Sequence, residues 1–236
     1  MEDYIPFCGL PPLPSELWSR WTLEPGLLLG LALLLIAGLM HATHRPRFLA
    51  AWALVAMLFV SPICAASMAL FSVRVGQHIL LVLVAAPLMA SALPRFNRAP
   101  MPLALIFAGF FWLWHAPAPY QATLQSDLVY WTMHITLFTS AVLLFSSLFN
   151  ARARALPATA VTALQMTLYA VLLVFSPRVW HDWHLEVTEA YGLSALADQQ
   201  LAGALMWVAG GAILLTIIAV MTYQFLRDGE RTAHVR

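Results

Sequence analysis

The sequence has little charge and no lysine. Only 10% of its 236 residues are charged, whereas a soluble domain carries about 25%, so the composition excludes a soluble enzyme. All 12 basic residues are arginine, which excludes Schiff-base chemistry on a lysine. The net charge of +1 offers no global field for nucleic acid, and no glycine-rich loop is present to cradle a phosphate.

Cysteine is also scarce. Cys8 and Cys64 are too few for a disulfide framework or a CxxC site, and Cys8 is expected to be an exposed thiol in a mobile arm. The first 21 residues contain acids before any base, several prolines and no apolar core, so they do not have the pattern of a cleavable signal.

The chain is instead rich in long apolar segments, with 61% apolar residues and a mean hydropathy of +0.79. A membrane-spanning helix needs about 20 mostly apolar residues. We therefore predict an all-α integral membrane protein, a seven-transmembrane-helix bundle that forms a single membrane domain over residues 1–236, with an outer proline-rich arm and a cytoplasmic tail. The expected arm is 1–22, the spans are 23–40, 48–71, 75–93, 101–114, 128–149, 157–175 and 199–226, and the tail is 227–236.

Arginine placement predicts the orientation, because short cytoplasmic loops retain positive charge. Most arginines fall on one side when the loops are counted alternately, and the N-terminus is therefore expected outside and the C-terminus in the cytoplasm. The inner set is Arg45, Arg47, Arg95, Arg98, Arg152, Arg154, Arg227, Arg231 and Arg236, and the outer set is Arg20, Arg74 and Arg178.

Ionisable and sulfur-bearing side chains gather near the outer ends of the expected spans. Such groups are costly inside a membrane unless they face a polar interior, so each is a functional candidate. Imidazole, thiolate and thioether are the ligands that select Cu(I), and the sequence therefore predicts a copper site near the outer face. The expected metal ligands are His78, His134, His115, Met206, Met68 and Cys64.

Other polar residues are expected around the ligands or at a contact with a partner: Arg74, Gln77, Asp198 and Gln199. Arg74 can pair with Asp198, and Asp198 can alternatively cap the last span. Structural roles are open for the ligands too, because methionine often fills gaps in a core and Cys64 can be a buried apolar residue. His181 and His184 are expected to be solvated loop residues, with metal capture as the alternative.

Four stretches of this sequence carry a family resemblance: Ser61–Cys64, Phe71–His78, Trp114–Pro117 and Asp198–Trp207. Together they resemble the CtaG-type cytochrome c oxidase assembly factors. The resemblance implies a seven-helix protein of the bacterial cytoplasmic (inner) membrane that helps a haem-copper respiratory oxidase to mature. The fifth expected span matches the family pattern only loosely, so the resemblance does not point to His134. The residues to which the resemblance points are Arg74, Gln77, His78, His115, Asp198, Gln199 and Met206.

These observations lead us to expect a non-enzymatic assembly factor, a chaperone that holds Cu(I) transiently and passes it to an oxidase subunit. No nucleophile, base and orienting group stand at a recognisable spacing. The expected partners are that subunit and the lipid bilayer, with an outer copper chaperone and a homodimer as further candidates and no nucleic acid. The alternatives are a haem protein in which two histidines such as His78 and His134 ligate one iron, and a metal-free scaffold for subunit insertion. A copper transporter is less favoured, because the inner halves of the spans are almost entirely apolar.

Overall fold

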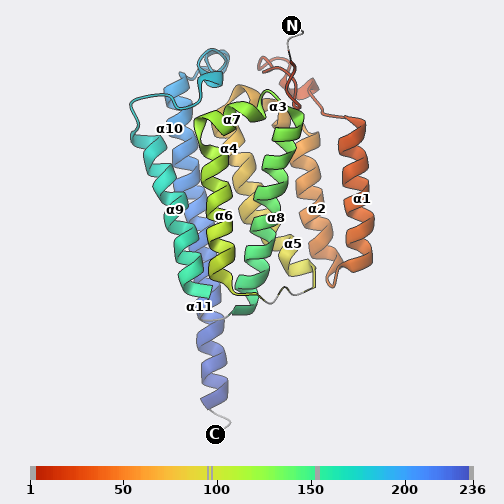
Figure 1. The fold of residues 1–236 in the computed structure, drawn as a ribbon, viewed down its shortest axis with the longest axis vertical. Coiled ribbons are helices and arrows are strands. Elements are labelled where there is room, and N and C mark those ends of the chain that lie inside the picture. The colour runs from red at the N-terminus through yellow and green to blue at the C-terminus, as the bar shows by residue number, and fades with distance from the viewer. Residues whose placement is uncertain (1–3, 95, 97, 152–154, 234–236) are drawn as a thin grey trace.

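The computed structural model describes residues 4–94, 96, 98–151 and 155–233, and all regular structure in these ranges is helical. The long helices lie side by side as a bundle (Figure 1). The N-terminal arm and the loop after α9 lie at one end, called the arm end below, and α11 projects from the opposite end. The helices are α1 (Pro25–His41), α2 (Arg45–Val60), α3 (Pro62–Ala69), α4 (Phe71–Leu80), α5 (Ala86–Ala92), α6 (Pro100–His115), α7 (Pro117–Thr123), α8 (Asp127–Ala151), α9 (Ala155–Phe175), α10 (Ala195–Leu205) and α11 (Gly211–Ala233), with shorter 3-10 turns η1 (Leu17–Ser19), η4 (Asp182–His184) and η5 (Glu189–Tyr191).

Four helices are long and apolar enough to cross a membrane: Phe71–Ala92, Asp127–Ala151, Ala155–Phe175 and Ala195–Val220. Two bent pairs, α2 with α3 and α6 with α7, have the composition of one span each, and α1 is a shorter apolar helix. These units fall at the seven expected segments. The structure therefore supports four to six spans, and the count of seven stays a prediction.

Two sharp bends interrupt the apolar segments, and the first of them corrects the expectation of a continuous span over 48–71. The expected span 48–71 breaks between α2 and α3 with a bend of 52°, and α6 is followed by α7 after a bend of 76°. Pro62 and Pro117 stand at the first positions of α3 and α7. Proline has no N–H to continue the preceding helix but is well suited to begin a new one, so the chain turns at both sites and closes the arm end.

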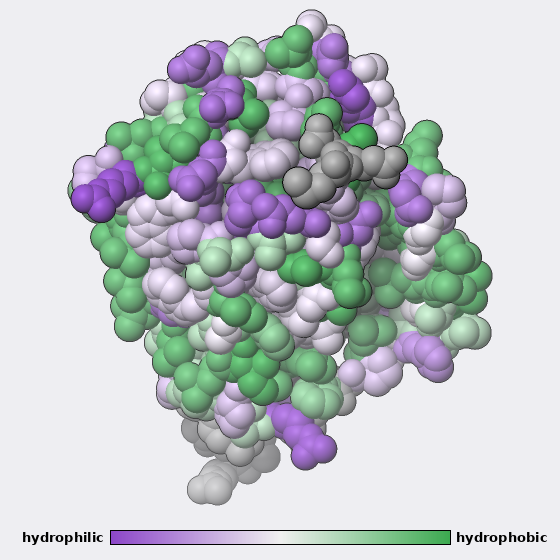
Figure 2. All heavy atoms as spheres, turned by 45° about the horizontal axis from the view of Figure 1, so that its top comes forward, coloured by the Kyte–Doolittle hydropathy of each residue, from purple (hydrophilic) through white to green (hydrophobic). Residues whose placement is uncertain are grey.

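Hydrophilic side chains concentrate at the arm end of the surface (Figure 2), where exposed apolar residues of the arm such as Trp18 lie among them. Figure 2 shows hydrophilic residues gathered on the arm end and hydrophobic residues over the flank. An apolar flank of this kind suits a lipid environment. The orientation across the membrane stays a prediction, and four of the arginines on which it depends, Arg95, Arg152, Arg154 and Arg236, lie outside the described residues.

The N-terminal arm is packed against the bundle, so the expectation of a mobile arm with an exposed thiol was wrong. Cys8 is buried and forms a disulfide with Cys64 of α3, with 5.3 Å between their Cα atoms. Gly9 has φ +84, a left-handed conformation that favours glycine, and its N–H closes the turn over Phe7 and Cys8 by donating to the carbonyl oxygen of Pro6 at 2.7 Å. The ring of Phe7 stacks on that of Tyr130 of α8 with 5.3 Å between centroids.

Two helical spans contain a π-helical turn: η2 (Leu81–Ala85) follows α4, and η6 (Met206–Gly210) follows α10. Such wide turns often occur at functional sites. The two turns lie against each other, because a Cβ placed on Gly210 would stand 3.7 Å from Leu83.

The helix α10 approaches α9 so closely that only glycine fits at position 203. A Cβ there would stand 2.8 Å from the carbonyl oxygen of Ala170 and 2.8 Å from Cγ2 of Val174. We expect Gly203→Ala to force the two helices apart and to lower the free energy of unfolding by about 1–3 kcal/mol. Thermal unfolding of the detergent-purified protein, followed by tryptophan fluorescence, measures the effect.

Gly211→Ala is the matched control, because it lies in the same span and a Cβ there meets nothing within 4 Å. This control should leave stability unchanged or slightly raised, since alanine favours helix over glycine. Equal melting temperatures for the two variants would contradict the close approach of α9 and α10.

Candidate functional site

Three histidines from three neighbouring helices meet inside the bundle. His78 of α4, His115 of α6 and His134 of α8 are all buried. The ring centroid of His78 lies 5.7 Å from that of His115 and 5.2 Å from that of His134. The structure thus brings together the three histidines selected from the sequence, and they are called the histidine cluster below.

Two rings of the histidine cluster have a fixed tautomer. Nδ1 of His115 lies 2.7 Å from the carbonyl oxygen of Phe111, and Nδ1 of His134 lies 2.9 Å from that of Tyr130. A carbonyl oxygen only accepts hydrogen bonds, so both Nδ1 atoms carry the hydrogen and each Nε2 presents a lone pair.

The Nε2 atoms of all three histidines are buried, and none has a hydrogen-bond partner among the described residues. Unpaired buried polar atoms are uncommon in proteins and call for a physical explanation. Three of them on adjacent rings make the histidine cluster a candidate binding site.

A small cavity of about 20 Å³ adjoins two of these rings, and its wall includes two methionines as well as His78 and His115. Met206 is the first residue of η6, and Met166 belongs to α9. The volume is close to that of a single bound water, so a monatomic ion fits there. The full lining is His78, Ile79, Val82, Phe107, Phe111, His115, Leu137, Met166 and Met206.

Met166 is the residue that sequence reasoning missed. It lies nine residues before the end of α9 at Phe175, while Met206 lies eleven residues after the start of α10 at Ala195. Both helix ends are at the arm end, so the two sulfurs are at similar depth, and counting from the loop could have found Met166.

The side chains at the cavity that could bind a metal ion are of two chemical kinds. Within residues 4–94, 96, 98–151 and 155–233, no group of three or more His, Cys, Asp and Glu side chains is arranged to hold a metal ion. Donors at the cavity are instead two imidazoles and two thioethers, a combination of ligands that favours Cu(I) over hard cations.

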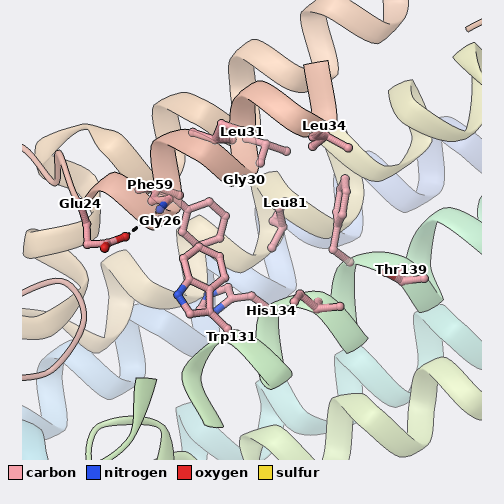
Figure 3. A pocket seen from close by; sticks show the side chains of 14 residues that line it. Glu24, Gly26, Gly30, Leu31, Leu34, Phe59, Leu81, Trp131, His134 and Thr139 are labelled. Carbon is pink, nitrogen blue, oxygen red and sulfur yellow. Dashed lines mark hydrogen bonds between the residues drawn. The ribbon is translucent and has the colours of Figure 1, made fainter. Parts of the chain in front are cut away.

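A larger groove of about 530 Å³ reaches His134 from the flank of the bundle, between α1 and α8 (Figure 3). Gly26 and Gly30 form part of its α1 wall, and Phe59 and Trp131 lie beside His134. A homodimer stays a prediction.

Two of the expected sulfur ligands lie elsewhere. Cys64 is bonded to Cys8, and a disulfide offers no thiolate to a metal, so Cys64 is no ligand while the disulfide is closed, and its role as a ligand stays a prediction for the reduced protein. The Sδ atom of Met68 lies 3.7 Å from Nη1 of Arg74, which donates to it.

Arg74 is a buried cation, and no carboxylate pairs with it in the described part of the chain. The single ion pair among the described residues joins Arg20 to Glu16, so the alternative in which Arg74 pairs with Asp198 was wrong. The guanidinium lies 5.1 Å from the ring centroid of Tyr120 and 5.6 Å from that of Tyr130. Cation-π contacts of this kind stabilise the charge in part, and Nε of Arg74 has no partner in the described part of the chain.

Asp198 instead caps a neighbouring helix. Its carboxylate accepts hydrogen bonds from the backbone N–H of Phe71 at 2.6 Å, from that of Ser72 at 3.2 Å and from the Ser72 hydroxyl. These groups belong to the first turn of α4, where a negative charge is favourable. Asp198 therefore joins α10, which leads to Met206, to α4, which carries His78.

Gln77 and Gln199 each hold a segment of backbone in place through hydrogen bonds. Gln77 donates from Nε2 to the carbonyl oxygen of Leu58 at 2.8 Å and so ties α4 to α2. Gln199 accepts from the N–H of Trp180 at 2.7 Å and donates to the carbonyl oxygen of Arg178 at 3.0 Å. It thereby fixes the loop between α9 and α10 on the bundle.

The histidines of that loop are buried, so the expectation of solvated side chains was wrong. Nε2 of His184 lies 2.8 Å from the hydroxyl of Tyr120, and the ring of His181 packs on that of Tyr120 with 4.0 Å between centroids. Burial lowers the pKa of His181 to about 3, helped by the nearby charge of His184. Burial, with a smaller effect of Arg74, also lowers the pKa of His184 to about 3.

Comparison with known proteins identifies one family. The family model described as cytochrome c oxidase caa3 assembly factor (Caa3_CtaG) matches residues 91–228, more than half of the chain. The match includes His115, His134, Met166 and Met206, whereas His78 precedes it. No curated protein and no solved structure matches the chain.

Acid should destabilise the arm end. Below the unfolded pKa of about 6.5 the unfolded chain binds protons that folded His181 and His184 do not bind, so stability falls as the pH drops from about 6.5 towards about 3. At about pH 5 each histidine should cost about 2 kcal/mol. Melting temperatures measured between about pH 7.5 and pH 5 test this.

His181→Gln and His184→Gln should each reduce the pH dependence, while the exposed His41→Gln should not change it. An unaltered slope in both loop variants would show that these histidines are not buried in the folded protein.

Removing the cap on α4 should also destabilise the protein. Asp198→Ala leaves the buried N–H groups of Phe71 and Ser72 without their acceptor, at a cost of about 2–4 kcal/mol. Asp198→Asn retains one acceptor oxygen and should cost less. The control is the exposed Asp182→Ala, and a melting temperature of Asp198→Ala equal to that control would contradict the capping role.

Proposed function

Since the chain belongs to the family of caa3 cytochrome c oxidase assembly factors, we propose that it carries one Cu(I) ion during maturation of the oxidase. The ion is cargo: it is bound transiently at the cavity between His78, His115, Met166 and Met206, and then passed to an oxidase subunit. The protein itself catalyses no reaction in this proposal.

The observation that carries the proposal is the set of unpartnered Nε2 atoms in the histidine cluster. Each is buried, and the Nδ1 hydrogen bonds of His115 and His134 orient the rings as second-shell contacts orient metal-ligating histidines. A cation binds neutral imidazoles without displacing protons, and two thioethers at the same cavity favour the monovalent copper ion.

His134 has a distinct part in this proposal, because it belongs to the histidine cluster and also borders the apolar groove. A ligand exchanged from His78 to His134 would move the ion towards the flank of the bundle. The groove opens on the side where a membrane-embedded helix of the oxidase would lie, so this route avoids water.

The proposal includes seven spans in the bacterial cytoplasmic membrane, with the arm end outside. Helix α1, the two bent pairs and the four long helices supply the spans, and the arginine distribution supports the direction. The cavity then lies towards the outer face, where an outer copper chaperone can deliver the ion.

The geometry favours copper over haem. Two histidines that ligate one haem iron stand on opposite faces of the porphyrin, so the macrocycle has to fit between them. The rings of His78 and His134 lie 5.2 Å apart and edge to face, and the cavity beside His78 has a volume of about 20 Å³.

Cu(I) titration of the detergent-purified protein against a coloured chelator, with ascorbate to maintain Cu(I), tests the proposal. We expect one ion per chain in the wild type. His78→Ala and His115→Ala should weaken binding by about tenfold or more, since each removes a ligand. Met206→Leu preserves volume and should weaken binding less.

The control is His41→Ala, which changes an exposed histidine at the opposite end of the bundle. Wild-type affinity in His78→Ala and His115→Ala would refute the site. A protein that binds no copper but is still needed for oxidase activity in cells would be a scaffold, and a Soret band lost in His78→Ala would indicate haem.

A further inference from the structure

We infer that Cys8 and Cys64 form a second Cu(I) site, which is closed while they are joined as a disulfide and opens when the disulfide is reduced. This inference rests on the proposed copper-carrying function and adds to it a receiving site at the arm end, outside the histidine cluster. Its ligand class is Cu(I) held by two thiolates.

The placement of the two sulfurs carries the inference. The disulfide joins the arm to α3 with 5.3 Å between Cα atoms, and both residues are buried. One metal ion can bridge two thiolates up to about 4.6 Å apart, because a metal–sulfur bond is about 2.3 Å long. After reduction, a small rotation of both side chains is therefore enough to admit an ion.

A third sulfur lies on the same helix. Met68 follows Cys64 by four residues in α3, so the two side chains lie on one face of the helix. Met68 is fully buried. A thioether beside two thiolates completes a soft donor set for Cu(I).

The buried charge of Arg74 also favours a copper–thiolate group here. One Cu(I) ion with two thiolates has a net charge of −1, and Arg74 is a buried cation with no carboxylate partner in the described residues. Its Nη1 donates to Sδ of Met68 at 3.7 Å. Reduction and copper loading would thus provide the counter-charge that the disulfide form lacks.

Tyr130 connects this pair to the histidine cluster. Its hydroxyl lies 3.3 Å from Sγ of Cys8 and 3.8 Å from Sγ of Cys64, and its carbonyl oxygen accepts from Nδ1 of His134. Tyr130 and His134 are one turn apart on α8, about 6 Å along the helix axis. An ion leaving the cysteines therefore has His134 as its next ligand.

The electrons and protons that reduce the disulfide come from the dithiol of another protein. Two thiols of that donor give two electrons and two protons to the disulfide, which becomes two thiols as the donor becomes a disulfide. Binding of Cu(I) then displaces the two thiol protons. The copper ion keeps its oxidation state throughout.

The test compares two redox forms of the full-length protein in detergent. One sample keeps the disulfide, verified by alkylation and mass measurement. The other is reduced with a phosphine and freed of it without air. Cu(I) is titrated into both against the chelator, and the melting temperature of every variant is measured beside the wild type.

We expect the reduced wild type to bind one more Cu(I) ion than the oxidised form. Cys8→Ser/Cys64→Ser should lose the additional ion and keep the one at the histidine cluster. His78→Ala should weaken binding of the cluster ion by about tenfold or more and leave the additional ion unchanged, so failure of either site is distinguishable from failure of the other. Met68→Leu should weaken the additional site without changing the count.

Equal copper counts in the two redox forms would overturn the inference, and so would an additional ion that persists in Cys8→Ser/Cys64→Ser. Two free thiols in protein alkylated during extraction from the membrane would overturn the redox control.

Discussion

The carboxylate of Asp198 is the interaction on which the arrangement of the site depends. It lies at the start of the span that leads to Met206 and caps the first turn of α4, which carries His78. The N-terminal N–H groups of a helix that begins inside a protein need acceptors, because water cannot reach them. By supplying one from another helix, the chain ties together two elements far apart in sequence. The relative position of a nitrogen donor and a sulfur donor then follows from a single buried carboxylate.

Part of this arrangement could be predicted from sequence. Helix geometry relates residue number to depth, so His78, His115, His134 and Met206 were expected at one level before any contact was known, and all four meet near the cavity. Apolar length predicted the helices, although not the sharp bends at Pro62 and Pro117, where a span and the short helix beside it have continuous hydropathy.

Other features of the structure could not be predicted from the spacing of residues along the sequence. The disulfide joins residues 56 apart, and only the folded path of the arm shows that they meet. The loop histidines were expected in water, but Gln199 folds the loop back on the bundle. Their opposite charges suggested a pair between Arg74 and Asp198, but the Asp198 carboxylate accepts hydrogen bonds from backbone N–H groups of α4 instead. In each case a long-range contact outweighed the local pattern.

The π-helical turns η2 and η6 also change which side of each span faces the interior of the bundle. A π turn holds one residue more than an α turn, so the residues beyond it are rotated by about 100° relative to a regular helix. In both spans this offset begins at the depth of the cavity, just after His78 in one and at Met206 in the other. The arm-end half of each span can therefore present donors inward while the other half keeps an independent lipid-facing stripe. Losing one residue from either turn would leave the span apolar and long enough to cross a membrane but would misalign its two halves, so the rotational alignment of these spans matters as well as their composition.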